Sequence, residues 1–317
     1  MGRVVITRRL PAGGLTPLLD AGHEVVTNDD DRVFGTTDLV EAARTSDAIV
    51  CLLTDRIDAE VLEAGAAGGR LRVVANAAVG YDNIDVTTAA RLGIVVTNTP
   101  DVLTETTADT TWLLILAARR LATGAEADLR AGRWAGWGFE DHLALDVHGA
   151  RLGLVGYGRI GRAVARRAVA FGMDVVHHTR HDTGAPGWTA DLDALLATAD
   201  VVSLHVPLTD TTRHLIDRDR LARLKGSATL VNTTRGPVVD EAALAEALHA
   251  GRLFSAGLDV YEHEPVVHPD LLTAPRTVLL PHIGSATVGT RTAMAHLAAT
   301  NAAAVLAGGP PPNRVTS

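Results

Sequence analysis

The sequence predicts an α/β protein built from two doubly wound parallel-sheet domains. The chain has 317 residues, which is long for one compact domain and comfortable for two. Short runs rich in β-branched residues alternate with helix-like stretches, a pattern typical of parallel sheets. The alternation occurs in two separate series, and the second series opens with a strand, a glycine-rich loop and a helix.

The first series predicts the strands of one sheet and then a buried helix. The expected strands are Arg3 to Thr7, Glu24 to Thr27, Ala48 to Thr54, Arg72 to Ala77 and Ile94 to Thr97. After Pro100 we expect a helix from Thr106 to Leu121. Its centre around Trp112 is apolar on every face, which predicts burial inside a domain or between subunits.

The second series predicts a second sheet and a returning terminal helix. The expected strands are Arg151 to Val155, Asp174 to Thr179, Val201 to Val206, Thr229 to Asn232, Ser255 to Val260 and Thr277 to Leu280. An alanine-rich helix from Ala286 to Ala307 ends at a Gly-Pro-rich stop. If this helix packs on the first sheet, residues 1–98 and 288–317 form one domain and residues 99–287 the other. The chain then crosses twice between them, which predicts a hinge and a cleft.

Composition and charge exclude several classes of protein. The net charge of −8, from 37 acidic and 29 basic residues, argues against nucleic-acid binding. No apolar run reaches the roughly 18 residues of a membrane span, and the N-terminus lacks the pattern of a signal peptide, so we expect a cytoplasmic protein without membrane contact. Cys51 is the single cysteine, and His177, His178 and His181 have no carboxylate or cysteine pattern beside them, so no metal is expected.

A G-x-G-x-x-G motif predicts a dinucleotide site. It follows the strand that ends at Val155 and precedes a helix from Arg162 to Phe171. Gly156 permits a tight turn, Gly158 lets the backbone approach a pyrophosphate, and Gly161 lets the helix pack on the strand. The alternative is a purely structural glycine turn, which the strand and helix on either side make less attractive.

The residues after the next strand bear on the choice between NAD and NADP. An NAD site ordinarily places an acidic residue about 20 positions on, where it binds the ribose 2′-hydroxyl, whereas an arginine suits a 2′-phosphate. Arg180 stands at this place and Thr179 adds a hydroxyl donor, so we favour NADP(H), with NAD as the other possible cofactor. Two alternatives stay open: a solvated Arg180 in a site that takes both cofactors, or Asp182 as the acidic residue.

Polar residues at the ends of later strands predict a catalytic crevice, because open α/β sheets bind ligands at the carboxyl ends of their strands. Arg235, in an exposed-looking turn before Gly236, is the expected clamp for an anion, and a surface arginine is the alternative. Glu264 and His282 are the expected acid pair, because a carboxylate on one ring nitrogen sets the tautomer and favours the protonated imidazole. For the histidine, a surface or structural role is the alternative.

Six segments follow one another in order along the chain: Ala78 to Asp85, Asn98 to Asp109, Gly156 to Gly161, Asn232 to Gly236, Gly257 to Pro265 and Pro281 to Thr287. Together they make the chain resemble the D-isomer-specific 2-hydroxyacid dehydrogenases, and most of all their glyoxylate/hydroxypyruvate reductases. The resemblance implies a flavodoxin-like substrate-binding domain, residues 1–98 and 288–317, and a Rossmann NAD(P)-binding domain, residues 99–287.

The resemblance also implies a role for individual residues. Arg235, Glu264 and His282 correspond to the catalytic residues, and Leu53, Val79 and Gly80 join Arg235 and His282 in contacting the substrate. The implied cofactor contacts are Thr107, Gly156, Tyr157, Gly158, Arg159, Ile160, Gly161, Thr179, Arg180, Val206, Pro207, Thr233, Asp259 and Gly284.

The implied reaction is reduction of a small 2-oxo acid, glyoxylate or hydroxypyruvate, by hydride transfer from NAD(P)H with His282 as general acid. A D-lactate, D-3-phosphoglycerate or phosphite dehydrogenase with the same three residues stays open, as does a non-catalytic dinucleotide sensor. The resemblance further implies a homodimer through the cofactor domain, which would explain the helix at Trp112 and the exposed-looking Trp134 and Trp137. Ordinary core packing is the other interpretation of these tryptophans.

Overall fold

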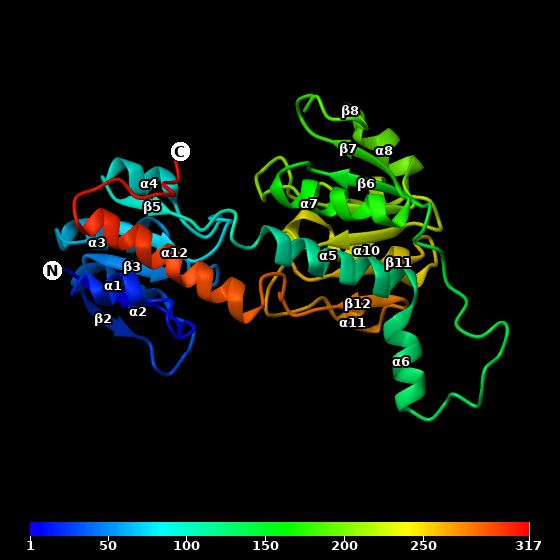
Figure 1. Ribbon diagram of the computed structural model, residues 1–317, viewed down its shortest axis with the longest axis horizontal. Helices are drawn as coiled ribbons and strands as arrows, with labels where there is room; N and C mark the ends of the chain where they lie inside the picture. Colours follow the sequence, from blue (N-terminus) through cyan, green and yellow to red (C-terminus); the bar gives the residue numbers. More distant parts are fainter. Residues whose placement is uncertain (317) are drawn as a thin grey trace. The chain divides into compact units, whose positions relative to one another are not determined.

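The computed structural model describes residues 1–316, and the chain forms two compact units (Figure 1). The first unit comprises Met1–Leu103 together with the chain from Ala286 onward, and the second comprises Thr104–Ser285. The terminal helix therefore belongs to the first unit, although the whole second unit precedes it in the sequence.

The first unit is a five-stranded parallel sheet in the order β2-β1-β3-β4-β5. Its strands are β1 Arg3–Ile6, β2 Glu24–Thr27, β3 Ala48–Cys51, β4 Val73–Asn76 and β5 Val95–Thr97. Every residue of β3 and β4 is buried, as is usual for parallel strands that are covered on both faces. β3 ends earlier than predicted because the amide of Asp55 donates to the carbonyl of Leu52 and turns the chain.

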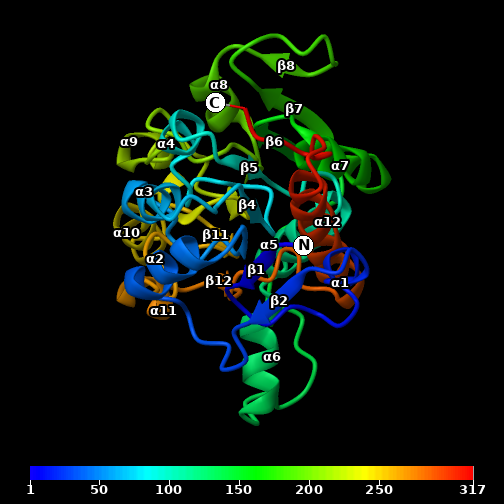
Figure 2. The same cartoon turned by 90° about the vertical axis from the view of Figure 1, so that its left-hand side faces the viewer.

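Helices cover both faces of the first sheet (Figure 2). They are α1 Thr16–Asp20, α2 Thr36–Thr45, α3 Ala59–Ala67, α4 Val86–Arg91 and α12 Val288–Leu306. α2, α3 and α4 enclose one apolar core with residues such as Val5 and Ile49. α1 and α12 enclose the other core, where Ala298 and Ala302 lie against Val50 and Ala75. The alanines of α12 allow this helix to lie close to the sheet.

The second unit is a seven-stranded sheet in the order β12-β11-β10-β9-β6-β7-β8, again with parallel pairing. Its strands are β6 Arg151–Val155, β7 Asp174–His178, β8 Trp188–Thr189, β9 Val201–Leu204, β10 Thr229–Asn232, β11 Ser255–Leu258 and β12 Thr277–Leu279. β8 was not predicted, because two residues are too few to make a recognisable strand pattern. Together the two sheets confirm the predicted fold class.

Helices also cover both faces of the second sheet. They are α5 Thr104–Arg119, α6 Ala122–Arg130, α7 Arg159–Ala168, α8 Leu192–Thr198, α9 Arg218–Leu221, α10 Glu241–His249 and α11 Pro269–Thr273, with 3-10 turns η1 Val169–Phe171 and η2 Gly236–Val238. α5 and α7 pack on one face and α8 and α10 on the other. Trp112 of α5 is buried in the core, where it stacks on Phe171 at 4.5 Å between ring centroids. Core packing is thus the correct interpretation of this tryptophan.

The register of the second sheet brings the predicted site segments to one edge. Val155 of β6 pairs with Leu204 of β9, Leu204 pairs with Asn232 of β10, and Asn232 pairs with Leu258 of β11. The residues that follow these strands, among them Gly156 and Asp259, therefore emerge at the same end of the sheet. No helix in the described part of the chain is long and apolar enough to span a membrane.

Candidate active site

The glycine-rich loop forms the tight turn that its sequence predicts. Gly156 has a φ of +98°, and a Cβ added to it would lie 2.4 Å from the carbonyl oxygen of His205. A Cβ added to Gly161 would lie 2.6 Å from the carbonyl oxygen of Gly156, whereas one added to Gly158 would meet nothing within 4 Å. Neighbouring backbone carbonyl groups therefore pack tightly against the loop at Gly156 and Gly161, whereas the loop is open at Gly158. A pyrophosphate needs this arrangement.

The segment after β7 carries the residues expected near the adenosine ribose. β7 ends at His178, so Thr179 and Arg180 are the first two residues beyond the strand, and Arg180 is exposed. The hydroxyl of Thr179 donates to the carbonyl of His181 at 2.6 Å and accepts from the indole of Trp188 at 3.1 Å. The carboxylate of Asp182 accepts from the amide of Gly184. The hydroxyl of Thr179 and the carboxylate of Asp182 thus both stabilise the loop itself. Arg180 is the exposed cation in this loop.

The ring of Tyr157, an expected cofactor contact, packs against the ring of another residue of the protein. Its ring stacks on His177 with 3.8 Å between centroids and 18° between planes. The Nε2 atom of His177 lies 2.9 Å from the hydroxyl of Thr183, and burial lowers the pKa of this histidine. The stack ties the glycine loop to β7 and to the segment after it.

The segment after β10 positions Arg235. Asn232, which is buried, accepts from the amide and hydroxyl of Thr234 and donates to the carbonyl of Arg235 at 2.9 Å. The side chain of Thr233 lies 3.0 Å from the hydroxyl of Thr111 on α5. The buried asparagine therefore shapes the turn that presents Arg235 and Thr233.

His282 and Glu264, the acid pair expected from the sequence, are joined by a hydrogen bond. Nδ1 of His282 donates to Oε2 of Glu264 at 2.7 Å, and the backbone of His282 has a φ of +55°, in the left-handed region that few non-glycine residues adopt. Burial raises the pKa of Glu264. The hydrogen bond and charge of His282 outweigh that effect, with help from the Tyr261 amide and the charge of Arg235, so that the pKa of Glu264 lies below its ordinary value. The carboxylate is therefore ionised at neutral pH and holds the imidazole by Nδ1, which leaves Nε2 for a substrate.

Two residues hold this pair in place, and the sequence did not assign them this role. The amide of Tyr261 donates to Oε1 of Glu264 at 3.0 Å, and its hydroxyl donates to the carbonyl of Leu280 at 3.0 Å. The buried carboxylate of Asp259, which we expected to contact the cofactor, accepts from the amides of Ile283 and Gly284, both at 2.7 Å. Burial raises the pKa of Asp259. The contacts with Leu280, Ile283 and Gly284 span 19 to 25 residues of sequence, a separation that conceals them from a reading of local patterns.

The expected substrate contacts in the first unit lie in two loops. Leu53 follows β3, and Val79 and Gly80 follow β4; all three are partly exposed. Asn83 joins the two loops, because its side-chain Nδ2 donates to the backbone carbonyls of Leu52 and Asp55. Among residues 1–316, no three His, Cys, Asp or Glu side chains are grouped in a way that could hold a metal ion.

Comparison with known proteins identifies the family. A family model described as D-isomer specific 2-hydroxyacid dehydrogenase, NAD binding domain, matches residues 112–284. A glyoxylate reductase of Thermococcus onnurineus is 45% identical over 324 residues, which cover 99% of this chain and 95% of the relative. The chain belongs to the D-isomer specific 2-hydroxyacid dehydrogenases. The family inferred from the six sequence segments is therefore confirmed, and the chain is an oxidoreductase with a dinucleotide-binding domain.

Two solved structures have backbones that superimpose closely on this dehydrogenase. A protein of Thermus thermophilus superimposes with a TM-score of 0.93 and 45% identity, covering 99% of this chain and 100% of the other. The NADPH-dependent glyoxylate/hydroxypyruvate reductase of Sinorhizobium meliloti, in complex with NADP and malonate, has a TM-score of 0.86 and 37% identity over 99% of this chain and 96% of its own.

Proposed function

We propose that this dehydrogenase reduces glyoxylate and hydroxypyruvate to the corresponding 2-hydroxy acids, with NADPH as the preferred cofactor. The observation that carries the proposal is the contact of 2.7 Å between His282 Nδ1 and Glu264 Oε2, with the charge of Arg235 close enough to lower the pKa of the same carboxyl. An acid pair beside an arginine suits an anionic carbonyl substrate. The names of the relatives, glyoxylate reductase among them, support this substrate class.

The glycine loop fits a dinucleotide. The space above Gly158 is open for a pyrophosphate, and the amides at the start of α7 face an anion favourably. Gly156, Gly158 and Gly161, with the backbone of Tyr157, Arg159 and Ile160, would hold the pyrophosphate. Thr107, Val206, Pro207, Thr233, Asp259 and Gly284 would line the rest of the site. When bound, the reduced dinucleotide supplies the hydride.

The protein's own residues would bind the substrate and supply the proton. Arg235 grips the substrate carboxylate with two charge-assisted hydrogen bonds and so orients the neighbouring carbonyl group. Nε2 of His282 donates a hydrogen bond to the carbonyl oxygen and transfers its proton as negative charge grows there. Glu264 stabilises the imidazolium before the transfer and keeps the ring oriented. Leu53, Val79 and Gly80 would provide further contacts to the substrate.

The proposal is tested by steady-state kinetics of the wild type and of His282→Ala. We expect turnover of glyoxylate with NADPH, and a fall in kcat of about 10²- to 10⁴-fold in the variant, the range typical for a lost general acid. His249, a histidine at the end of α10, serves as the matched control, and His249→Ala should retain wild-type kcat. If wild type and His282→Ala reduce glyoxylate equally fast, the assignment of the acid is wrong.

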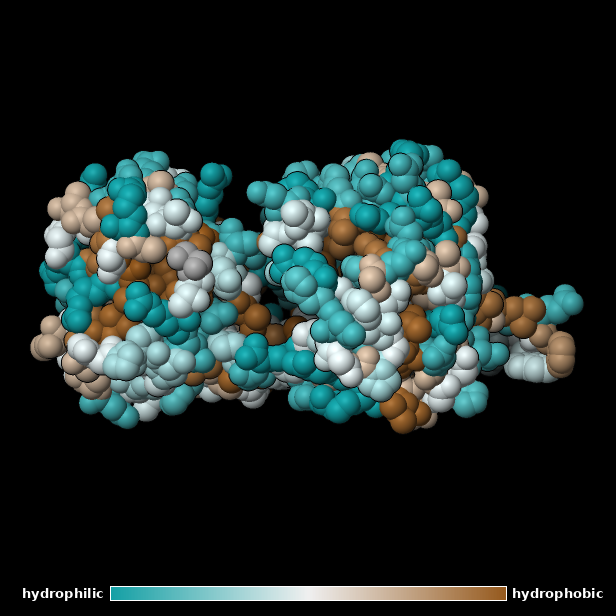
Figure 3. All heavy atoms as spheres, turned by 90° about the horizontal axis from the view of Figure 1, so that it is seen from above, coloured by the Kyte–Doolittle hydropathy of each residue, from teal (hydrophilic) through white to brown (hydrophobic). Residues whose placement is uncertain are grey.

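A second copy of the chain is the partner that we propose. Large apolar side chains of α6 and the segment after it are exposed, as Figure 3 shows for the part that protrudes from the second unit. These side chains are Leu129 at 56%, Trp134 at 56%, Trp137 at 81%, Phe139 at 84% and Leu143 at 68% exposed. Exposed apolar side chains gathered in one segment mark an interaction site, and Leu113 on α5 is a further exposed apolar side chain of this unit, at 51%.

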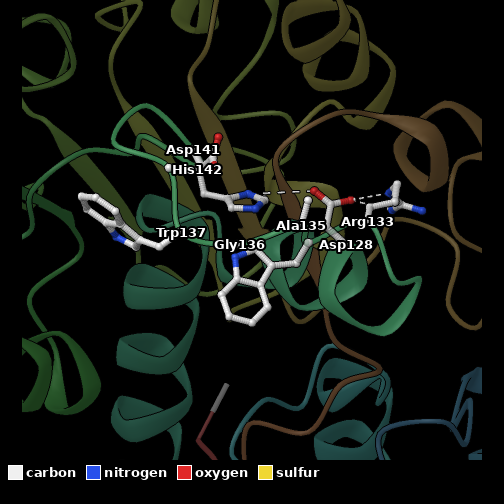
Figure 4. Close-up of a pocket in the computed structure, with 9 residues that line it drawn as sticks. Asp128, Arg133, Ala135, Gly136, Trp137, Asp141 and His142 are labelled. Atoms are coloured by element: carbon white, nitrogen blue, oxygen red, sulfur yellow. Dashed lines mark hydrogen bonds and ion pairs between the residues drawn. The ribbon is translucent and has the colours of Figure 1, made fainter.

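The same segment has internal contacts that give it a defined shape. Asp128 accepts hydrogen bonds from the guanidinium of Arg133 and lies 3.9 Å from Nδ1 of His142 (Figure 4). Trp137 and Phe139 meet edge to face with 5.9 Å between ring centroids. We refer to α6 and the segment after it, up to Leu143, as the arm. This ordered, apolar arm is suited to pack against a second protomer through the cofactor domain.

A further inference from the structure

We propose that Asn98 and Asn76 are positioning residues. Together with the backbone amide of Thr99, they turn three successive backbone amides, those of Val79, Gly80 and Tyr81, outward as a binding site for the substrate carboxylate. The inference rests on the proposed function and deepens it. It adds the amide of Tyr81 to the expected contacts of Val79 and Gly80, and it names the side chains that orient the amides of Gly80 and Tyr81.

Three neighbouring carbonyl groups of this loop are bound to the first unit. The carbonyl of Ala78 accepts from the amide of Thr99 at 2.9 Å. The carbonyl of Val79 accepts from Nδ2 of Asn98 at 2.8 Å, and the carbonyl of Gly80 accepts from Nδ2 of Asn76 at 2.7 Å. All three oxygens are therefore directed towards the body of the unit.

The bound carbonyls determine where the amides point. In a trans peptide the carbonyl and the next residue's N–H lie on opposite sides of the bond. With the three oxygens directed inward, the N–H groups of Val79, Gly80 and Tyr81 are directed away from the body of the unit. Within residues 1–316 none of these three amides donates a hydrogen bond to the protein, and Tyr81 is 39% exposed. Successive outward amides form a concavity that suits an anion.

The asparagines are themselves held in place. Asn76 is completely buried at the end of β4, and its Oδ1 atom lies 3.8 Å from Sγ of Cys51 on β3. Asn98 follows β5, and its backbone is fixed on both sides, because its amide donates to the carbonyl of Asn313 and its carbonyl accepts from Asn301 on α12. Both side chains therefore approach the loop from rigid strand ends, where small rearrangements are costly.

The test compares wild type with Asn98→Ala, because the side chain of Asn98 is partly exposed and can be removed with little effect on the core. Oxalate is the probe for carboxylate binding, measured by titration calorimetry, and glyoxylate is the substrate. We expect the dissociation constant of oxalate and the KM of glyoxylate to rise about 10- to 100-fold, the loss that one charge-assisted hydrogen bond typically causes. The dissociation constant of NADPH should stay within about twofold of wild type, which corresponds to a change in binding free energy of about 0.4 kcal/mol or less.

Asn28→Ala is the matched control, since Asn28 also donates from Nδ2 to two backbone carbonyls of the first unit, those of Thr7 and Arg32, both at 2.8 Å. It should leave oxalate and glyoxylate binding unchanged. If Asn98→Ala does not fold, the isosteric Asn98→Asp, which also lacks the donor, replaces it. Equal weakening of oxalate and NADPH binding, or no weakening of either, would overturn the proposal. The proposed function fails separately, if wild type itself does not reduce glyoxylate.

Discussion

At the scale of single residues, Glu264 determines how the active site responds to acid. Its pKa is lowered in the folded chain, so the interactions of its carboxylate stabilise the native state above the ordinary carboxyl pKa. This stabilisation is lost as the pH falls through the lowered value. We expect Glu264→Gln to destabilise the protein by about 1 kcal/mol near neutral pH, because the pair is partly exposed.

This difference in stability between wild type and Glu264→Gln should persist down to about pH 5. It should shrink below about pH 4, where the carboxyl of Glu264 becomes protonated first in the unfolded chain and then in the folded chain. Urea unfolding at several pH values measures it. Glu41→Gln, at an exposed position of α2, is the control and should show no such difference. A difference between Glu264→Gln and wild type that does not change with pH would contradict the role of the charge.

Arg180 is the residue on which cofactor preference should depend. It is exposed directly after β7, in the place where an NAD enzyme ordinarily carries an acid. We expect Arg180→Asp to lower kcat/KM for NADPH by about 10- to 100-fold, the value of a lost charge-assisted contact, and to lower it much less for NADH. The equally exposed Arg44→Asp, on α2, controls for net charge. Equal losses with both cofactors would mean that Arg180 does not recognise the 2′-phosphate.

At the scale of secondary-structure elements, the active site depends on two segments whose backbones touch. A Cβ added to Gly236, at the start of η2, would lie 1.8 Å from the carbonyl carbon of Tyr261. The turn that carries Arg235 is therefore pressed against the segment that carries Glu264. Gly236→Ala must separate them, which we expect to cost about 1–3 kcal/mol of stability and most of the activity.

Urea unfolding and kcat with glyoxylate measure both effects of Gly236→Ala. Gly226→Ala is the control, because a Cβ there meets nothing within 4 Å. Wild-type kcat in a folded Gly236→Ala protein would show that the spacing between the two segments is not essential for catalysis.

At the scale of the whole molecule, the exposed arm predicts the state of assembly. We expect wild type to sediment as a dimer. Replacing Trp137 and Phe139 together by serine should raise the dissociation constant roughly 10³-fold, since an aromatic residue that anchors an interface contributes about 2 kcal/mol and two of them about 4 kcal/mol. Val169→Ser, which removes a 74% exposed apolar side chain outside the arm, should leave the dimer intact. A monomeric wild type would overturn the proposal.

The sequence by itself determined the α/β class, the succession of most strands and helices, the glycine loop and the family. Strand and helix periods and the G-x-G-x-x-G spacing are local properties, so a linear pattern carries them. It also predicted that His282 and Glu264 belong together, on resemblance and chemistry, without any evidence of contact.

Only the tertiary structure decided which groups actually meet. It showed the pair at 2.7 Å, the capture of the Ile283 and Gly284 amides by Asp259, the burial of Trp112, and the short edge strand β8. The carbonyl of Val79 is likewise held by Asn98, 19 residues away. Such contacts follow from the order and register of parallel strands, which join residues far apart in the chain at one edge of a sheet. No local period records that order, because each parallel pairing depends on crossovers and on the burial of both sheet faces.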